Sequence, residues 1–190
     1  MIKAIFLAAG QSKRIKCENK LVKRYKKTPL INHSLKVLHK TKVNKVIIVL
    51  GHQRKEVKKI ILKNKKNIFI YNKDYKKGMA SSIKVGLKKV VRNDKGFIVV
   101  QSDMPFIKTK HINKICTSIQ KKKHLVHALR FKNRIGNPIG FDISVLGKFK
   151  KIKGEHGAKF MVKRLKKRTN FIKVSSSKVF KDFDLKKDFN

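Results

Sequence analysis

A short loop near the N-terminus carries residue types that bind phosphate. The loop spans residues 8–12, follows the apolar run 2–7, and is followed by Arg14 and Lys20. Small residues let backbone N–H groups approach a ligand closely, and the two cations add charge, so the pattern predicts a cradle for a phosphate chain. It is neither a P-loop nor a dinucleotide-binding fingerprint, because no Gly-Lys-Ser/Thr follows and Gly10 has no partner glycines. A tight turn with exposed cations is the alternative.

A carboxylate follows another apolar run. Asp103 comes after residues 97–101 and precedes Met104-Pro105, in a chain with only 10 Asp and Glu residues. Magnesium prefers one or two protein carboxylates together with substrate phosphates, so Asp103 at the carboxyl end of a central strand is a candidate Mg²⁺ ligand. A cap on the following turn is the alternative.

Two more carboxylates stand near the C-terminus. Asp182 and Asp184 adjoin the apolar segment 179–183, which predicts a strand. Alternation along a strand places both carboxylates on one side, so that one can meet a metal while the other supports it. An acidic surface patch that pairs with the abundant lysines explains them equally well.

A glycine and two serines open a predicted helix at residues 78–87. The hydroxyl groups of Ser81 and Ser82, with the free N–H groups of a helix start, can hydrogen-bond a nucleobase or a sugar. Ordinary N-capping of the helix is the alternative.

Apolar runs that alternate with amphipathic helical patterns predict the framework that positions these segments. Predicted strands cover residues 2–7, 46–50, 68–71, 97–101, 125–130, 171–174 and 179–183. Helical spacing appears at residues 31–38, 57–61, 79–90, 112–119 and after Gly157, with Thr109 as a predicted cap and 136–138 as a predicted turn. The pattern is typical of a Rossmann-like α/β fold, with a mostly parallel sheet and helices on both faces. Such a sheet binds ligands at the carboxyl ends of its strands.

The composition predicts a single domain over residues 1–190, because no Gly/Ser-rich linker or repeat divides the chain. Two cysteines, Cys17 and Cys116, lie far apart without a CxxC motif, which indicates neither a disulfide framework nor a zinc ribbon. No apolar stretch reaches 18 residues, and the first apolar run is too short for a secretory signal. We therefore expect a cytoplasmic protein that is neither exported nor bound to a membrane.

Charge is the most unusual feature of the composition. Lys and Arg number 52 against 10 Asp and Glu, which gives a net charge of +42. A chain with this charge attracts polyanions, so nucleic acid is a candidate partner. The lysines are spread through every segment, Trp is absent, and no aromatic interleaving for base stacking is evident. We interpret the charge as a compositional bias on a solvated surface, which disfavours nucleic acid as the partner.

Six segments, taken in order, resemble the motifs of the MobA-like nucleotidyltransferases, and most closely the molybdopterin (molybdenum cofactor) cytidylyltransferase branch. Residues 7–14 and 19–21 are similar to the opening LAAGxSxR…NKL pattern, and residues 78–82 to GMSSS. Residues 103–105, 136–138, 154–159 and 182–184 are similar to the GDxP, G[HN]P, GDxGAR and DID patterns, with Glu155 in place of the aspartate of GDxGAR. One departure is Ser102, which stands where the family has the glycine of GDxP.

The resemblance implies the nucleotide-diphospho-sugar transferase fold and a set of site residues. Mg²⁺ would be held by Asp103 and Asp184. The predicted catalytic residues are Lys20, Arg14 and Asp103, with the two cations on the triphosphate. The predicted nucleotide-binding residues are Leu7, Ala8, Ala9, Gly10, Arg14, Lys20 and Ser82, and the predicted acceptor-binding residues are Asn137 and Glu155.

The resemblance also implies a reaction, the Mg²⁺-dependent transfer of CMP from CTP to the phosphate of molybdopterin, with release of pyrophosphate. The double alanine Ala8-Ala9 favours CTP, because guanylyl-transferring relatives tend to have Ala-Gly-Gly. A molybdoenzyme or its chaperone would receive the product. Two alternatives stay open: transfer to a sugar phosphate or another small phosphorylated acceptor, and a basic nucleic-acid-binding module.

Overall fold

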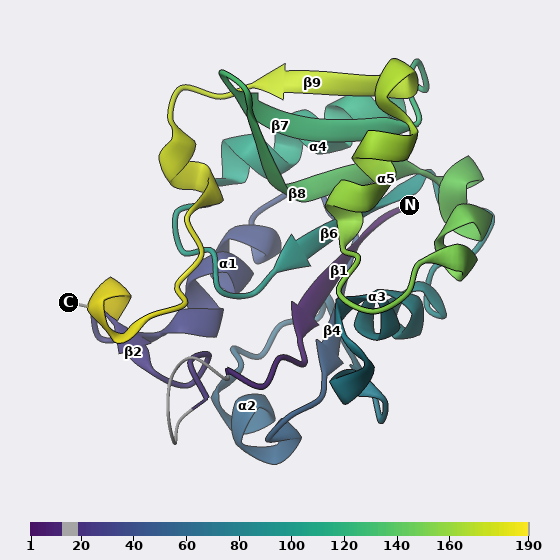
Figure 1. Cartoon of the computed structure of the whole chain (residues 1–190). Helices are drawn as coiled ribbons and strands as arrows, with labels where there is room; N and C mark the ends of the chain where they lie inside the picture. Colours follow the sequence, from purple (N-terminus) through teal and green to yellow (C-terminus); the bar gives the residue numbers. More distant parts are fainter. Residues whose placement is uncertain (13–18, 190) are drawn as a thin grey trace.

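A seven-stranded sheet forms the centre of the molecule (Figure 1). The structure is a computed structural model, and it describes residues 1–12 and 19–189. The strands lie in the order β5 (Asn67–Tyr71), β4 (Lys45–Leu50), β1 (Ile2–Ala8), β6 (Gly96–Gln101), β8 (Arg134–Asp142), β7 (Val126–Phe131) and β9 (Thr169–Lys173). The predicted strands over residues 2–7, 46–50, 68–71, 97–101, 125–130 and 171–174 correspond to members of this sheet.

The sheet is mostly parallel. β1 lies between β4 and β6 and runs parallel to both, so that Phe6 pairs with Ile48 on one side and Val100 on the other. β8 is antiparallel to both of its neighbours, whereas β7 and β9 are parallel to each other. The expected α/β fold with a mostly parallel sheet is confirmed.

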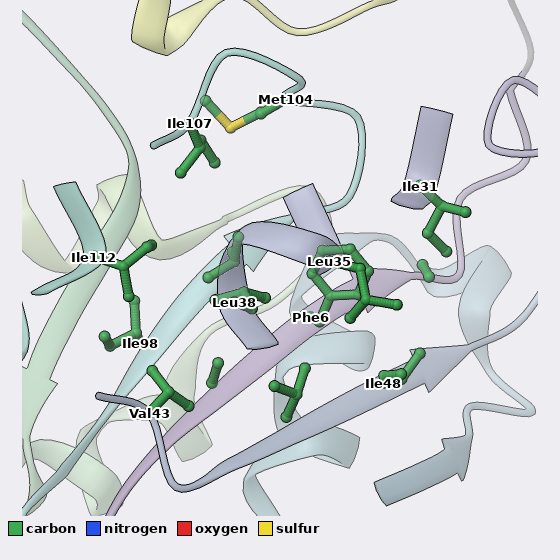
Figure 2. Packing of buried hydrophobic residues seen from close by; sticks show 14 of the residues in the cluster. Phe6, Ile31, Leu35, Leu38, Val43, Ile48, Ile98, Met104, Ile107 and Ile112 are labelled. Atoms are coloured by element: carbon green, nitrogen blue, oxygen red, sulfur yellow. The ribbon is translucent and has the colours of Figure 1, made fainter. Parts of the chain in front are cut away.

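Helices cover both faces of the sheet, because side chains that alternate along each strand bury apolar groups on both sides. One face packs against α1 (Leu30–His39), α2 (Arg54–Ile60) and α4 (Thr109–Gln120). Figure 2 shows this layer, with Leu35 and Leu38 of α1 over Phe6 of β1. The other face packs against α3 (Met79–Leu87), the 3₁₀ segment η2 (Ile143–Lys151) and α5 (Ala158–Arg164).

The remaining elements are short. β2 (Arg24–Tyr25) and β3 (Thr28–Pro29) form a separate two-stranded sheet before α1. Four short 3₁₀ turns are η1 (Tyr75–Lys77), η3 (Lys166–Arg168), η4 (Ser177–Phe180) and η5 (Lys186–Phe189). Figure 1 shows the chain returning after β9 toward β2, so that its last segment lies close to the early part of the chain.

Three local predictions are wrong. Residues 179–183 are not a strand: Ser176 caps η4 by accepting the N–H of Lys178, and Val179 and Phe180 reach the core from that turn. Apolar residues can thus be buried without a strand partner. Residues 136–138 are not a turn but part of β8, beside a register shift at Ala128/Leu129 and with a cis Asn137–Pro138 bond. Thr109 begins α4, and Lys108 holds the cap position.

Across the described ranges 1–12 and 19–189, no helix combines the length and the apolar character needed to span a bilayer.

Candidate active site

A cavity of about 400 Å³ opens at the carboxyl ends of the central strands, the position at which open α/β sheets bind ligands. Six segments that are distant in the sequence meet there: the loop after β1, the residues before β2, the start of α3, the end of β6, and two loops from the second half of the chain. The lining residues are Leu7, Ala9, Gly10, Gln11, Ser12, Lys20, Leu21, Tyr75, Lys76, Gly78, Met79, Ser82, Gln101, Ser102, Asp103, Glu155, Asp182 and Asp184.

The loop after β1 reaches the cavity with alternate residues. Leu7, Ala9 and Gly10 line it, as predicted for the nucleotide-binding loop. Ala8 does not line it, because strand alternation turns its methyl group into the core cluster with Phe6 on the opposite face. Any ligand contact by Ala8 would therefore have to use its backbone.

Ser12 connects this loop to Lys20. Its backbone has a φ of 54°, and its Oγ accepts the N–H of Lys20 at 3.0 Å. Asn19 Oδ1 accepts the N–H of Leu21 at 3.1 Å and so fixes the turn on the other side of Lys20. Arg14, the second predicted triphosphate cation, lies outside the described residues.

Lys20 joins the two predicted metal carboxylates. Its Nζ lies 2.6 Å from Asp103 Oδ2 and 2.7 Å from Asp184 Oδ1. Burial lowers the pKa of Lys20, but the two carboxylates outweigh burial and raise this pKa above its ordinary value. Burial raises the pKa of Asp103 above its usual range; Lys20 opposes this shift, and the charge of Asp182 adds to it. A further cation beside this carboxylate would favour its ionised form.

Two hydrogen bonds between serine hydroxyls and backbone carbonyls hold the residue before Asp103 beside the β1 loop. Ser102 Oγ donates to the carbonyl oxygen of Leu7 at 2.6 Å, and the Ser102 carbonyl accepts the hydroxyl of Ser34 at 3.2 Å. Ser102, which departs from the family motif, thus ties the end of β6 to the end of β1. No local residue pattern predicts this role, because the contact depends on how the two strands are aligned.

An aromatic cluster brings the C-terminal carboxylates to Asp103. The buried ring of Phe183 packs against Tyr25 and Phe106, with centroid separations of 4.8 Å and 5.8 Å. The backbone N–H of Phe183 donates to the backbone carbonyl of Asp103 at 3.0 Å. Asp182 and Asp184, on either side of Phe183, both line the cavity. The predicted placement of both carboxylates on one side therefore holds, although no strand produces it.

Asp188 fixes the backbone next to Asp184. Its Oδ2 accepts the N–H groups of Asp184 and Leu185 at 3.0 Å and 2.9 Å. A C-terminal residue outside the cavity lining thereby orients a predicted metal ligand.

The donor set fits a divalent cation of the magnesium class. Asp103 Oδ1 is buried and has no hydrogen-bond partner among the described residues. The carboxylate of Asp184 lies close to that of Asp103, because both form an ion pair with the amino group of Lys20. In the part of the chain that the structure describes, no group of three or more His, Cys, Asp or Glu residues forms a candidate metal cluster. Magnesium does not need such a cluster, since it commonly uses one or two carboxylates and completes its coordination with phosphates and water.

The start of α3 forms the opposite wall of the cavity. Ser82, a predicted nucleotide-binding residue, is buried and lines the cavity. Gly78 has a φ of 93°, and a Cβ there would lie 2.5 Å from the Gly154 carbonyl oxygen, so only glycine permits this approach. Glu155, a predicted acceptor-binding residue, lines the cavity and accepts the N–H of Met79 through Oε2 at 3.3 Å.

Asn137, the other predicted acceptor-binding residue, is not brought to the cavity. It is buried within β8, and its Oδ1 lacks a hydrogen-bond partner within residues 1–12 and 19–189. The neighbouring Gly136 packs against the ring of Phe180, where a Cβ would lie 2.5 Å from Cδ1. The η4 turn thus packs against the backbone beside Asn137.

Comparison with known families decides what kind of protein this is. A family model described as MobA-like NTP transferase domain matches residues 4–169. The chain belongs to this family. It is therefore a nucleotidyltransferase domain.

Curated relatives of the MobA-like domain include the bifunctional protein GlmU of Campylobacter fetus, which is 31% identical over 138 residues. That alignment covers 71% of this chain and 30% of GlmU. The chain spans 26–35% of the length of the GlmU proteins that it matches.

Solved structures share the fold at low identity. Rv0371c from Mycobacterium tuberculosis superposes with a TM-score of 0.86 at 21% identity, covering 99% of this chain and 95% of that one. Rv0371c has also been solved as a complex with manganese, which matches with a TM-score of 0.76 at 19% identity over 92% of this chain and 89% of that one. The 4-diphosphocytidyl-2C-methyl-D-erythritol synthase of Anaerococcus prevotii matches with a TM-score of 0.75 at 16% identity, covering 99% of this chain and 92% of that one. These relatives do not bear on the molybdopterin branch.

Proposed function

We propose that this MobA-like domain transfers a nucleoside monophosphate from an NTP to a phosphate group of a small acceptor and releases pyrophosphate. The observation that carries the proposal is the Lys20 amino group, which lies between Asp103 and Asp184 in the cavity beside the β1 loop. The charges match the two groups that the reaction must bind, a polyanionic triphosphate and its divalent cation.

The reaction brings two anions together, so its barrier is mainly electrostatic. An oxygen of the acceptor phosphate forms a bond to the α-phosphorus, and the bond from that phosphorus to the bridging α–β oxygen breaks. The electron pair of this broken bond leaves with pyrophosphate. No protein nucleophile is required, and the domain contributes position and charge.

When nucleotide binds, the Lys20 amino group would contact the triphosphate in addition to the carboxylates, and its positive charge would be shared between them. Arg14 would add a second positive charge. The backbone at Ala9 and Gly10, which lines the cavity, would hold the nucleotide in place. Glu155 would face the acceptor, and it also caps α3.

Asp103 and Asp184 would hold a divalent cation, which we propose to be Mg²⁺. When bound, such a cation neutralises phosphate charge and stabilises the leaving pyrophosphate. Two observations support this assignment: Asp103 Oδ1 has no hydrogen-bond partner among the described residues, and Rv0371c has been solved as a complex with manganese.

Our specific proposal for the substrates is CTP and molybdopterin. It is supported by the six motif resemblances and by the Ala8-Ala9 pair. A molybdoenzyme or its chaperone in the cytoplasm would then receive the product. The second candidate is transfer to a sugar phosphate or a polyol phosphate, which the similarity to the Anaerococcus synthase favours.

Pyrophosphate release tests the proposal. The purified domain is incubated with Mg²⁺ and each of the four NTPs, alone and with reduced molybdenum cofactor, sugar 1-phosphates or polyol phosphates. We expect release with CTP that depends on molybdenum cofactor, while release with another acceptor would establish the second candidate. No release from any pair, together with salt-sensitive DNA binding, would instead support the nucleic-acid-binding module.

A further inference from the structure

Asn72 is a buried polar residue beside the cavity that none of the motif assignments uses. It directly follows β5, is 1% exposed, and donates its backbone N–H to the Leu50 carbonyl at 2.8 Å. Its position is therefore fixed by the sheet.

The hydrogen bonds of the Asn72 side chain define which way its amide faces. Oδ1 accepts the backbone N–H of Asp74 at 3.0 Å, which assigns the oxygen to that side. Nδ2 then faces α3 and donates to Ser81 Oγ and Ser82 Oγ, both at 2.9 Å. One amide thus holds two consecutive hydroxyl groups at the start of the helix.

The two hydroxyl groups differ in whether their proton is available to a ligand. Ser81 Oγ can give its proton to the carbonyl oxygens of Asp74 or Gly78, at 2.9 Å and 2.8 Å. Ser82 Oγ accepts from Asn72, and no residue in the described ranges accepts the Ser82 proton. Since Ser82 lines the cavity, its hydroxyl is left as a hydrogen-bond donor toward a ligand.

The surroundings of Ser82 favour a neutral acceptor atom of a ligand over a phosphate oxygen. The first N–H groups of α3 are already used: Met79 N donates to Glu155, and Ala80 N donates to the Gly154 carbonyl at 3.0 Å. A carboxylate therefore occupies the helix start and repels a second anion there. A carbonyl oxygen or ring nitrogen of a nucleobase suits a lone hydroxyl donor.

We propose that Asn72 is a positioning residue for nucleobase recognition: it holds the Ser82 hydroxyl so that the hydroxyl donates to an acceptor atom of the base. This inference rests on the proposed function, because it needs an NTP in the cavity. Asn72 itself does not line the cavity and acts through Ser82.

The decisive variant is Asn72→Asp. It keeps an oxygen for Asp74 N–H but replaces the amide donor by an acceptor, so the Ser82 proton turns toward the new carboxylate and away from the ligand. We expect the Kd for NTP, measured by calorimetry with Mg²⁺, to rise about tenfold, as for one lost hydrogen bond. Inorganic tripolyphosphate, which has no base, should bind to the variant and the wild type alike.

Asn32→Asp is the matched control. Asn32 is also a buried asparagine, with Nδ2 donating to the Ile60 carbonyl and Oδ1 accepting from Leu62 N, but it does not line the cavity. This control should affect the melting temperature without changing the Kd for NTP. In steady-state assays, Asn72→Asp should raise the KM for NTP, with kcat and the KM for the acceptor within about twofold.

Serine variants keep the inference testable if Asn72→Asp does not fold. Ser82→Ala should weaken NTP binding about tenfold, whereas Ser81→Ala should not. In the Ser82→Ala background, Asn72→Asp should add little, because the two substitutions remove the same contact. Additive losses, equal losses for the two serines, or an equal loss of tripolyphosphate binding would each overturn the positioning role. If the wild type binds no NTP, the proposed function fails as well; if it binds NTP and Asn72→Asp binds equally, only this inference fails.

Discussion

The Nζ of Lys20 lies 2.7 Å from Asp184 Oδ1, although 164 residues separate the two positions in the sequence. The same amino group also contacts Asp103 at 2.6 Å. This link between the first and last parts of the chain forms the charged end of the cavity.

Replacing Asp103 by asparagine should abolish activity while preserving the fold. The variant keeps the side-chain shape but loses the charge that would hold the divalent cation, so we expect turnover to fall at least about 100-fold. Circular dichroism melting should show a normal transition, because Asp103 is a buried carboxylate whose pKa burial has already raised. Asp142→Asn is the control, since Asp142 caps a turn at Ser144 and does not line the cavity. Near-normal Mg²⁺-dependent turnover by Asp103→Asn would refute the metal assignment.

Lys20→Gln should reduce the rate far more than the stability. We expect a fall in kcat of about 100-fold, because the charge that would neutralise the triphosphate is lost. The free energy of unfolding should change by at most about 2 kcal/mol, because glutamine keeps an N–H donor and burial already raises the pKa of Asp103, so that this carboxyl can take up a proton when Lys20 is removed. Lys77→Gln, which removes an exposed ion pair with Asp74 near the same cavity, should leave both quantities nearly unchanged. Comparable losses of stability and activity in Lys20→Gln would indicate a structural lysine.

Gly10→Ala should separate ligand binding from folding. A Cβ at Gly10 would meet no heavy atom within 4 Å, so the fold tolerates it, yet the methyl group would stand at the cavity wall. We expect NTP affinity to fall about tenfold or more while the melting temperature stays the same or rises slightly. Gly147→Ala is the control, because a Cβ there also meets nothing within 4 Å and the residue is remote from this cavity. Unchanged nucleotide binding by Gly10→Ala would show that the ligand does not approach this loop.

His127 should make folding stability depend on pH. It is fully buried, and burial lowers its pKa to about 4, with the charge of His124 adding to the effect. The folded state therefore disfavours protonation relative to the unfolded chain, in which the pKa is about 6.5. This contribution to stability is complete above about pH 6.5 and is lost as the pH falls toward 4. The loss in the free energy of unfolding is about 2 kcal/mol at pH 5.

Urea unfolding at pH 7.5 and pH 5.0 measures this effect. His127→Gln should reduce the pH slope, even if it is less stable overall, and the rest of the slope should come from His39 and His111, whose pKa burial also lowers. The exposed His156→Gln should keep the full slope. An unchanged slope in His127→Gln would assign the pH dependence to other groups. Ser118, whose hydroxyl contacts His127 Nδ1 at 2.7 Å, belongs to the same buried network.

Much of the fold follows from local patterns, because β1, β4 and β6 are buried on both sides and read as continuous apolar runs. Asp103 could be assigned from its place after such a run. The predicted strand over residues 179–183 does not position Asp184. The packing of the Phe183 ring positions it instead, and such packing has no local periodicity in the sequence. Asn137 was expected at the acceptor site from a motif alone, and its burial inside β8 could not be read from neighbouring residues. Ser102 acts through a hydrogen bond between distant segments, and the contacts of Asn72 with Ser81 and Ser82 depend on how the end of β5 packs against α3, so no residue pattern reveals either.

The central claim is that the Lys20, Asp103 and Asp184 cluster supports transfer of the α-phosphoryl group of an NTP. An NTP labelled with ³²P at the α-phosphate, incubated with Mg²⁺ and the acceptor that supports pyrophosphate release, tests it directly. The account predicts that the label appears in the acceptor product in amounts equal to the unlabelled pyrophosphate, and that Asp103→Asn abolishes both. Label that stays in free nucleotide while inorganic phosphate accumulates, or transfer that persists in Asp103→Asn, would contradict it.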